Sequence, residues 1–268
     1  MRRATRAGWR VSLASSLLTA PFSPGVAQSP PRYDAARLAC AVFEERVRTE
    51  VRAQEAGVPW EETGERFGRL VFRAQPEDGA IRFEAWYDSL TVRYDARAGR
   101  VEPDTDGLIG GRWAGRLTAT GSVELVTRPF MPPDLRAVSD LSEALLDFLP
   151  PLPAASLLPG SQWTDSLGLT VRRLADSTAA EGAVARYEWT IRSRGALPVE
   201  ADSTLRIRQE AEDEGRLAWR DDLGVLGWTR RVTVETQLAR AGRGGSSHRG
   251  RVVQQIRVRR ITAGASCG

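Results

Sequence analysis

Apolar and polar residues alternate with a period of two through most of the chain. Near the amino-terminal end of the chain, Val47, Thr49 and Val51 alternate with charged residues. Near the carboxy-terminal end, Val232 and Val234 alternate with polar and charged residues. Successive side chains of a β-strand point to opposite faces, so this pattern is typical of a sheet with one apolar and one wet face. Counted in this way, the sequence predicts about 11–12 strands.

Segments rich in glycine, proline and acidic residues separate the predicted strands. Residues 76–79 (PEDG) are a strong turn signal, and Gly121 marks a turn between strands at 110–120 and 123–127. The sequence also predicts a turn at residues 212–215. Residues 57–64 and 239–250 are the predicted longer loops.

One amphipathic helix is predicted from about Ser139 to Leu149, with Ser139 as a candidate N-cap; the alternative is an earlier start, which extends the helix over about residues 134–149. The proline-rich residues 150–160 end it and form a crossover between two strand-rich halves. The predicted fold class is therefore mainly β: a curved antiparallel sheet or partial barrel with one central helix. The apolar residues at helical spacing are Leu135, Val138, Leu141, Leu145 and Phe148.

Residues 1–27 have the pattern of a secretory signal peptide: an arginine-rich start, an apolar stretch at 11–22 and small residues before the predicted cut. Residues 28–39 then read as a linker, and residues 40–268 as a single β-rich domain. The apolar stretch is shorter than the roughly 20 residues that span a bilayer. We expect a protein exported to the periplasm or beyond, soluble after cleavage and without a transmembrane anchor.

Two other readings of the amino terminus are less favoured. A twin-arginine signal would use Arg2 and Arg3, but Ala4 and Thr5 replace the usual apolar pair. A lipid anchor on Cys40 is rejected because Arg37 occupies an apolar position of that motif.

Cys40 and Cys267 are the two cysteines of the chain. Export would place them in an oxidising compartment, where a pair usually forms a disulfide. The predicted bridge would tie the two ends of the domain together. A redox or metal-binding pair is less favoured because the C-x-x-C spacing is missing.

The positive net charge of the chain comes from its amino terminus. The first 27 residues hold four arginines and no acid, so the remainder has 34 basic and 34 acidic residues. A neutral domain lacks the broad positive field that nucleic acid binding requires, and nucleic acid is therefore excluded as a partner.

No catalytic, metal-binding or cofactor-binding set of residues emerges from the sequence. His248, the single histidine, lies in a glycine-rich segment without a nucleophile motif. Residues 102–107 resemble a calcium loop only faintly, because Trp113 replaces its final glutamate. The acidic pairs Glu44–Glu45 and Asp221–Asp222 are read as solvated edges. The seven tryptophans that follow residue 27 are read mainly as core residues.

The order of strands, helix and strands resembles that of lipoprotein carriers of the LolA and LolB type. Residues 158–165 (LPGSQWTD) are also similar to segments of uncharacterised exported bacterial β proteins. The resemblance implies an apolar cavity between a curved sheet and a helix. The leading hypothesis is thus a non-catalytic envelope protein that binds a lipid-like ligand there. The alternative is an interaction module for an envelope protein partner, and a hydrolase is the least favoured.

Overall fold

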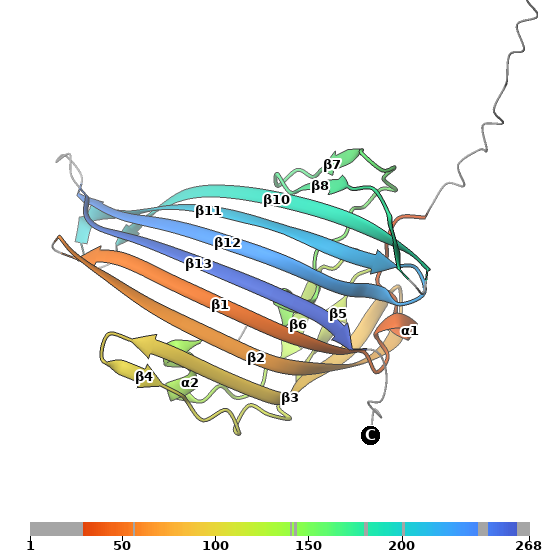
Figure 1. The fold of residues 1–268 in the computed structure, drawn as a ribbon, viewed down its shortest axis with the longest axis horizontal. Coiled ribbons are helices and arrows are strands. Elements are labelled where there is room, and N and C mark those ends of the chain that lie inside the picture. The colour runs from red at the N-terminus through yellow and green to blue at the C-terminus, as the bar shows by residue number, and fades with distance from the viewer. Residues whose placement is uncertain are drawn as a thin grey trace, which may run out of the picture.

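The protein forms one large antiparallel sheet whose long strands lie side by side, with short strands at its two edges and helices behind it (Figure 1). The structure, a computed structural model, describes residues 29–55, 57–139, 141, 144–179, 182–199, 202–240 and 246–261. The sheet has 13 strands and its path, from β6 to β7, does not close in the described part of the chain. The predicted mainly β fold with a curved sheet is confirmed.

The elements have the following bounds. The long strands are β1 (Val42–Glu55), β2 (Val58–Glu77), β3 (Ala80–Ala96), β10 (Gly182–Val199), β11 (Asp202–Arg220), β12 (Gly224–Arg240) and β13 (Ser246–Ile261). The short strands are β4 (Gly99–Val101), β5 (Trp113–Leu117), β6 (Val123–Thr127), β7 (Gln162–Thr164), β8 (Thr170–Arg173) and β9 (Ser177–Ala179). The helices are α1 (Ala35–Leu38), α2 (Pro133–Val138) and the 3₁₀ helix η1 (Ala144–Phe148).

Two meanders make up the central part of the sheet and meet in its middle. Strands β1 to β3 form the first meander and β10 to β13 the second. They are joined by β1 and β13, which pair antiparallel from Val42 opposite Ile261 to Glu55 opposite His248. Residues at the two ends of the chain therefore become neighbours at the centre of the sheet.

The chain between the two meanders, residues 102–176, adds β5 to β8 at the two edges of the sheet, and its helices α2 and η1 pack against one face (Figure 1). We call this stretch the crossing segment, the face it covers the inner face, and the opposite face the outer face. Phe148 of η1 packs edge-to-face on Phe43 of β1 and Tyr87 of β3, with ring centroids 6.4 and 6.2 Å apart. Such aromatic pairs add to the burial of apolar area that fixes the crossing segment on the sheet.

The predicted helix is shorter than expected and is divided. Helix α2 ends at Ser139, whose backbone is extended (φ −154°, ψ 106°), so this residue is a C-cap and not the predicted N-cap. Serine side chains compete for backbone hydrogen bonds and favour caps over helix interiors, which accounts for the end of α2 at Ser139. The predicted apolar spacing survives, because Leu141, Leu145 and Phe148 are buried.

Two predicted breaks in the strands are wrong. The loop predicted at residues 57–64 is instead the start of β2, which begins at Val58. Pro59 lies before the part of β2 that pairs with β3, which starts at Thr63, so the missing N–H of Pro59 does not interrupt the hydrogen bonds between β2 and β3. Residues 212–215 continue β11 instead of forming a turn. A Cβ on Gly215 would lie 2.1 Å from an indole carbon of Trp189, so this glycine serves close packing.

The turn predicted at 76–79 is confirmed, with Asp78 and Gly79 at positive φ between β2 and β3. The predicted signal peptide and Cys267 lie outside the described residues, so export and the disulfide stay predictions. Cys40 lies two residues before Val42, whose partner Ile261 is six residues before Cys267. No helix among the described residues is long and apolar enough to cross a membrane.

Candidate ligand-binding groove

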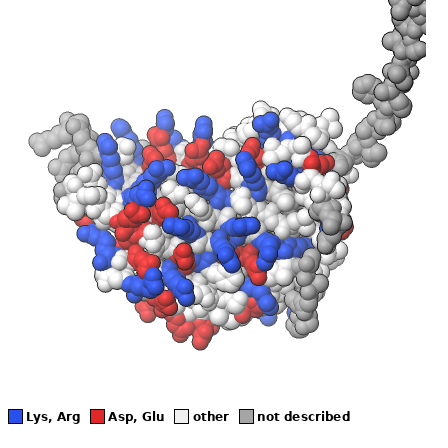
Figure 2. Space-filling model, in the orientation of Figure 1, with Lys and Arg blue, Asp and Glu red and all other residues white. Residues whose placement is uncertain are grey.

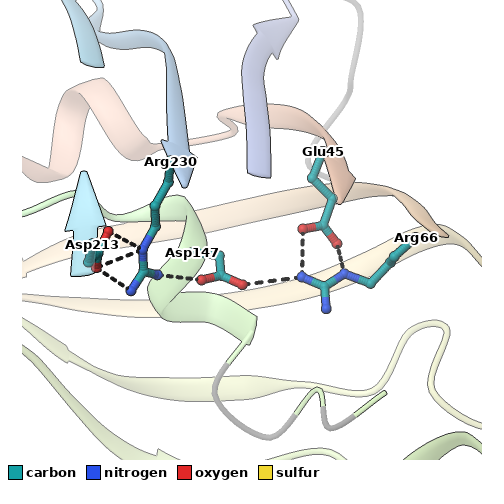
Figure 3. A network of polar contacts seen from close by, with 5 residues as sticks. All are labelled: Glu45, Arg66, Asp147, Asp213 and Arg230. Atoms are coloured by element: carbon teal, nitrogen blue, oxygen red, sulfur yellow. Dashed lines mark hydrogen bonds and ion pairs between the residues drawn. The ribbon is translucent and has the colours of Figure 1, made fainter. Parts of the chain in front are cut away.

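Two ion pairs, one from each meander, meet at a carboxylate of the crossing segment (Figure 3). Arg66 of β2 donates to Glu45 of β1 from Nε and Nη2, at 2.8 and 3.1 Å. Arg230 of β12 donates three times to Asp213 of β11, at 2.7–3.1 Å. Asp147 of η1 accepts from Arg66 at 3.2 Å and from Arg230 at 2.7 Å. This network ties η1 to both meanders.

The protonation states within the network follow from its burial. Burial raises the pKa of Asp147, against the opposing effect of Arg66 and Arg230. Burial alone would lower the pKa of Arg66, but the neighbouring Glu45 carboxylate raises it above its ordinary value. Burial also raises the pKa of Tyr87, whose hydroxyl donates to Glu45. With Glu45 and Arg66 inaccessible to solvent, the network is a structural clamp and not a binding site.

A groove of about 980 Å³ crosses the outer face from β3 to β10. Strand pairing aligns its outward-pointing side chains in two rows, two residues apart on each strand. Residues between the rows point inward and form the floor with their backbone; Arg66 and Arg230 are two of them. The clamp therefore holds the strands beneath the groove. The first row is Thr91, Phe67, Arg46, Arg257, Thr229, Arg216 and Glu188.

Six arginines and three glutamates of the groove point outward. Figure 2 shows the whole outer face, on which arginines and acidic residues alternate. At one end of the first row, Arg216 donates to Glu188 at 3.1 Å. In its centre, Arg46 lies directly opposite Arg257, and the Arg46 guanidinium is 5.3 Å from the ring centroid of Phe67. The groove thus combines an exposed aromatic ring with an excess of positive charge.

The space where the sequence predicted a ligand, between sheet and helix, is filled. Leu145 and Phe148 of η1 and Trp113 of β5 are almost completely buried against the inner face. The cavity found there, against Val138 and Ser139, measures about 40 Å³. This volume holds a water molecule but not an acyl chain. The predicted position of the ligand therefore finds no support in the described residues.

The residues considered for chemistry in the sequence do not come together. His248 is exposed near the end of the sheet, between Glu55 and Leu238 of the neighbouring strands. Glu44 and Glu45 point to opposite faces, as adjacent strand residues must. Asp221 accepts from Trp219 Nε1 at 3.2 Å, and Asp222 accepts from Arg220. Each of these four carboxylates thus has its own partner.

Residues 102–107, the faint calcium-loop candidate, form a turn. The backbone N–H of Asp106 donates to Asp104 at 2.8 Å, and Thr105 donates to the Leu90 carbonyl. Within the described ranges, no group of three or more histidine, cysteine or acidic side chains is placed to hold a metal ion.

The tryptophans divide between core and surface. The predicted core role holds for four of them, and the other three are half-buried. Arg112 covers the ring of one half-buried tryptophan, Trp86, at 3.6 Å from its centroid. The buried four are Trp113, Trp189, Trp219 and Trp228, and the half-buried three are Trp60, Trp86 and Trp163.

Sequence reasoning missed the groove and the clamp. The alternation in residues 46–52 places Arg46 and Arg48 on the wet face, but nothing in the sequence pairs them with Arg257 or Gln255 at the other end of the chain. The sequence does hold one signal for the clamp: Arg66 is an arginine at an inward-pointing position of its strand, where apolar residues are expected.

No protein-family model matches the chain, and no curated protein matches its sequence. Among solved structures, the chain is similar to lipovitellin with a TM-score of 0.46 and 10% identity, over 86% of this chain but 26% of lipovitellin. Lower-scoring matches include DynF from the dynemicin biosynthesis pathway of Micromonospora chersina (TM-score 0.24, 9% identity, 94% of this chain and 92% of that one). They also include an outer membrane lipoprotein-sorting protein domain, described as putative, from Vibrio parahaemolyticus (0.16, 10%, 83% and 87%).

The resemblance to lipoprotein-sorting proteins that the order of elements indicated thus recurs among solved structures, at low TM-scores. Likenesses of this degree carry no argument about what the protein binds. The function has to be argued from the groove itself.

Proposed function

We propose that the protein is a non-catalytic binding protein of the cell envelope that holds an amphiphilic, lipid-like ligand in the outer-face groove. The observation that carries the proposal is the groove itself, whose volume of about 980 Å³ is within the range of small-molecule sites. This places the ligand on the opposite face from the one predicted from the sequence.

The lining of the groove suits a molecule with an apolar chain and a polar end. Phe67 is 41% exposed and offers its ring to the solvent side of β2. Arginine side chains present alkyl stems along the walls and charged groups at the rim, and threonine adds methyl groups. A separate space of about 260 Å³, lined by Ala218 and Gly227, shares Arg216, Thr229 and Arg257 with the groove.

Titration of the mature protein with a neutral naphthylamine fluorescent probe tests the proposal. We expect saturable binding that Phe67→Ala weakens several-fold, because the exposed ring contributes apolar contact area. Val126→Ala is the matched control: Val126 is 75% exposed on β6, outside the groove, and its loss should leave binding unchanged. Absence of saturable binding, or equal effects of the two substitutions, would contradict a ligand in the groove.

A second candidate function, an interaction module, is favoured by one apolar row on the inner face. Val51, Val252, Val234 and Ala211 lie side by side on β1, β13, β12 and β11 and are half-buried. Cross-linking in the native compartment tests it. Val234→Glu should abolish cross-linking to a partner protein, whereas Thr233→Glu on the outer face should leave it unchanged. A partner that still cross-links to Val234→Glu would exclude this row as the interface.

A further inference from the structure

We infer that the centre of the groove binds a phosphoryl group between Arg46 and Arg257, so that the ligand is an amphiphile with an anionic phosphate head. This inference rests on the proposed function, because it names the chemistry of the ligand in the same groove. It is carried by the charges of the two central strands, β1 and β13.

Arg46 and Arg257 lie directly opposite each other across these strands. Like charges in directly opposite positions of an antiparallel pair destabilise the sheet. Within the described residues, neither guanidinium forms an ion pair; that of Arg46 lies over Phe67. The arrangement therefore leaves two adjacent positive charges that an anion from solution can neutralise.

Other outward-pointing arginines of the same two strands are paired with carboxylates. Arg48 pairs with Glu50 at 3.3 Å and Arg52 with Glu61 at 3.4 Å on the β1 side. On β13, Arg251 pairs with Glu235 at 3.6 Å and Arg259 with Glu44 at 2.6 Å. The pairing of their neighbours sets the central two arginines apart.

None of the acidic residues of the groove lies directly opposite Arg46 or Arg257, and Glu65, the nearest in the strand pairing, lies opposite Arg48. Glu65 is on β2, and Glu214 and Glu188 are on β11 and β10, so β1, β13 and β12 contribute no carboxylate to the lining. Glu188 is already paired with Arg216. Positive charge is thus concentrated where the groove crosses the middle of the sheet.

Phosphate is the anion that this arrangement fits best. Opposite residues in an antiparallel pair are about 5 Å apart at Cα, so both guanidinium groups can reach one tetrahedral anion. A guanidinium binds phosphate through two parallel N–H···O bonds, and stacking on Phe67 orients that of Arg46. Thr229, directly opposite Arg257 on β12, places a hydroxyl donor beside the same position.

The experiment compares a matched pair of amphiphiles, monolauroylglycerol and its phosphate ester, in binding to the mature protein, with inorganic phosphate as a third probe. We expect the phosphate ester to bind at least about tenfold more tightly than the neutral amphiphile. Arg46→Gln and Arg257→Gln should each weaken the affinity for the phosphate ester about tenfold and leave the affinity for the neutral amphiphile unchanged. Both arginines are exposed, so the fold should persist.

The control is Arg192→Gln. Arg192 points to the same face from β10, is paired with Glu212 at 2.6 Å and lies outside the groove. The substitution therefore makes the same change in net charge as Arg257→Gln without touching the groove. We expect less than a twofold effect. Equal affinity for the two amphiphiles, or equal effects of Arg192→Gln and Arg257→Gln, would overturn the inference.

The third probe separates the inference from the proposed function. Binding of inorganic phosphate as tight as that of the ester, and lost in Arg257→Gln, would support the site and identify free phosphate as its source. A clear preference for the ester would identify a lipid head. If neither amphiphile binds but phosphate does, the lipid-like ligand fails and the phosphoryl site stands; if no probe binds, both fail.

Discussion

The two faces of the sheet use the same charged residue types for opposite purposes. On the inner face, Glu45 and Arg66 are buried and joined through Asp147 to the second meander. On the outer face, Glu44 and Arg259 form one of many exposed pairs that meet water. Glu44 and Glu45 are neighbours of the same residue type, and both pair with an arginine. The difference between them is therefore their burial.

The difference follows from the environment of the charges. A buried charge without its partner is very costly, so inner-face charges must be fully satisfied and hold the crossing segment in one position. An exposed ion pair contributes little to stability, so outer-face charges can vary with little effect on folding. The inner face thus determines stability, and the outer face is where ligand recognition can be built.

The largest expected effect separates the two neighbouring glutamates. Glu45→Ala leaves the Arg66 guanidinium buried beside Asp147 alone and should lower the free energy of unfolding by about 3–5 kcal/mol. Glu44→Ala breaks an exposed pair and should cost about 0–1 kcal/mol. Urea denaturation of the mature protein measures both. Similar small losses would show that the clamp is not important for stability.

A second pair of neighbours tests how well the inner face is filled. Leu145 of η1 is buried, whereas Leu146 beside it in η1 is 40% exposed. Leu145→Ala should cost about 2–5 kcal/mol and open a cavity, and Leu146→Ala should stay within about 0.5 kcal/mol. The cavity can be detected directly, since an apolar cavity of this kind binds benzene. Equal losses, or no benzene-dependent stabilisation of Leu145→Ala, would contradict tight packing.

Gly215 offers a third contrast between close packing and open space. Gly215→Ala places a methyl group against the Trp189 indole and should cost about 1–3 kcal/mol. At Gly195, on β10, nothing described lies within 4 Å of an added Cβ, so Gly195→Ala should be neutral or slightly stabilising. Thermal unfolding distinguishes the two. A neutral Gly215→Ala would mean that Trp189 can move aside.

Gly215 also shows where prediction of the fold from the sequence stops. Alternation predicts the strands well, because a sheet with one covered face requires it at every position. The acidic residues and glycine at 212–215 are typical of a turn, and only the position of Trp189 on the neighbouring strand reveals that the glycine serves packing. The helix was overextended for a similar reason: its apolar spacing is real, but Ser139 ends it.

The groove and the clamp depend on register, which the sequence does not contain. Arg46 and Arg257 are recognisable as wet-face residues of two strands, but their pairing follows from the meeting of the first and last strands. Asp147 likewise finds Arg66 and Arg230 through the path of the crossing segment. Long-range pairing set by topology therefore defines both sites, and local patterns cannot.

The smallest expected effect compares two aspartates by the pH dependence of stability. Burial raises the pKa of Asp147 above its ordinary value of 3.8, so the folded state holds this proton more tightly than the unfolded state. Its contribution to stability is complete below that ordinary value and is lost as pH rises through the raised pKa. The stability difference between wild type and Asp147→Asn should therefore fall with increasing pH in this range.

Asp222 provides the opposite sign on the surface. Hydrogen bonding to Arg220 lowers its pKa, so its contribution is present above the ordinary value and is lost as pH falls through the lowered pKa. The difference between wild type and Asp222→Asn should thus rise with pH, and only slightly, because water screens this exposed pair. Urea denaturation in steps from acid to neutral pH measures both differences. If the Asp147 difference also rose with pH, the attraction of Arg66 and Arg230 would outweigh burial, and the contrast between the two faces would lose its electrostatic basis.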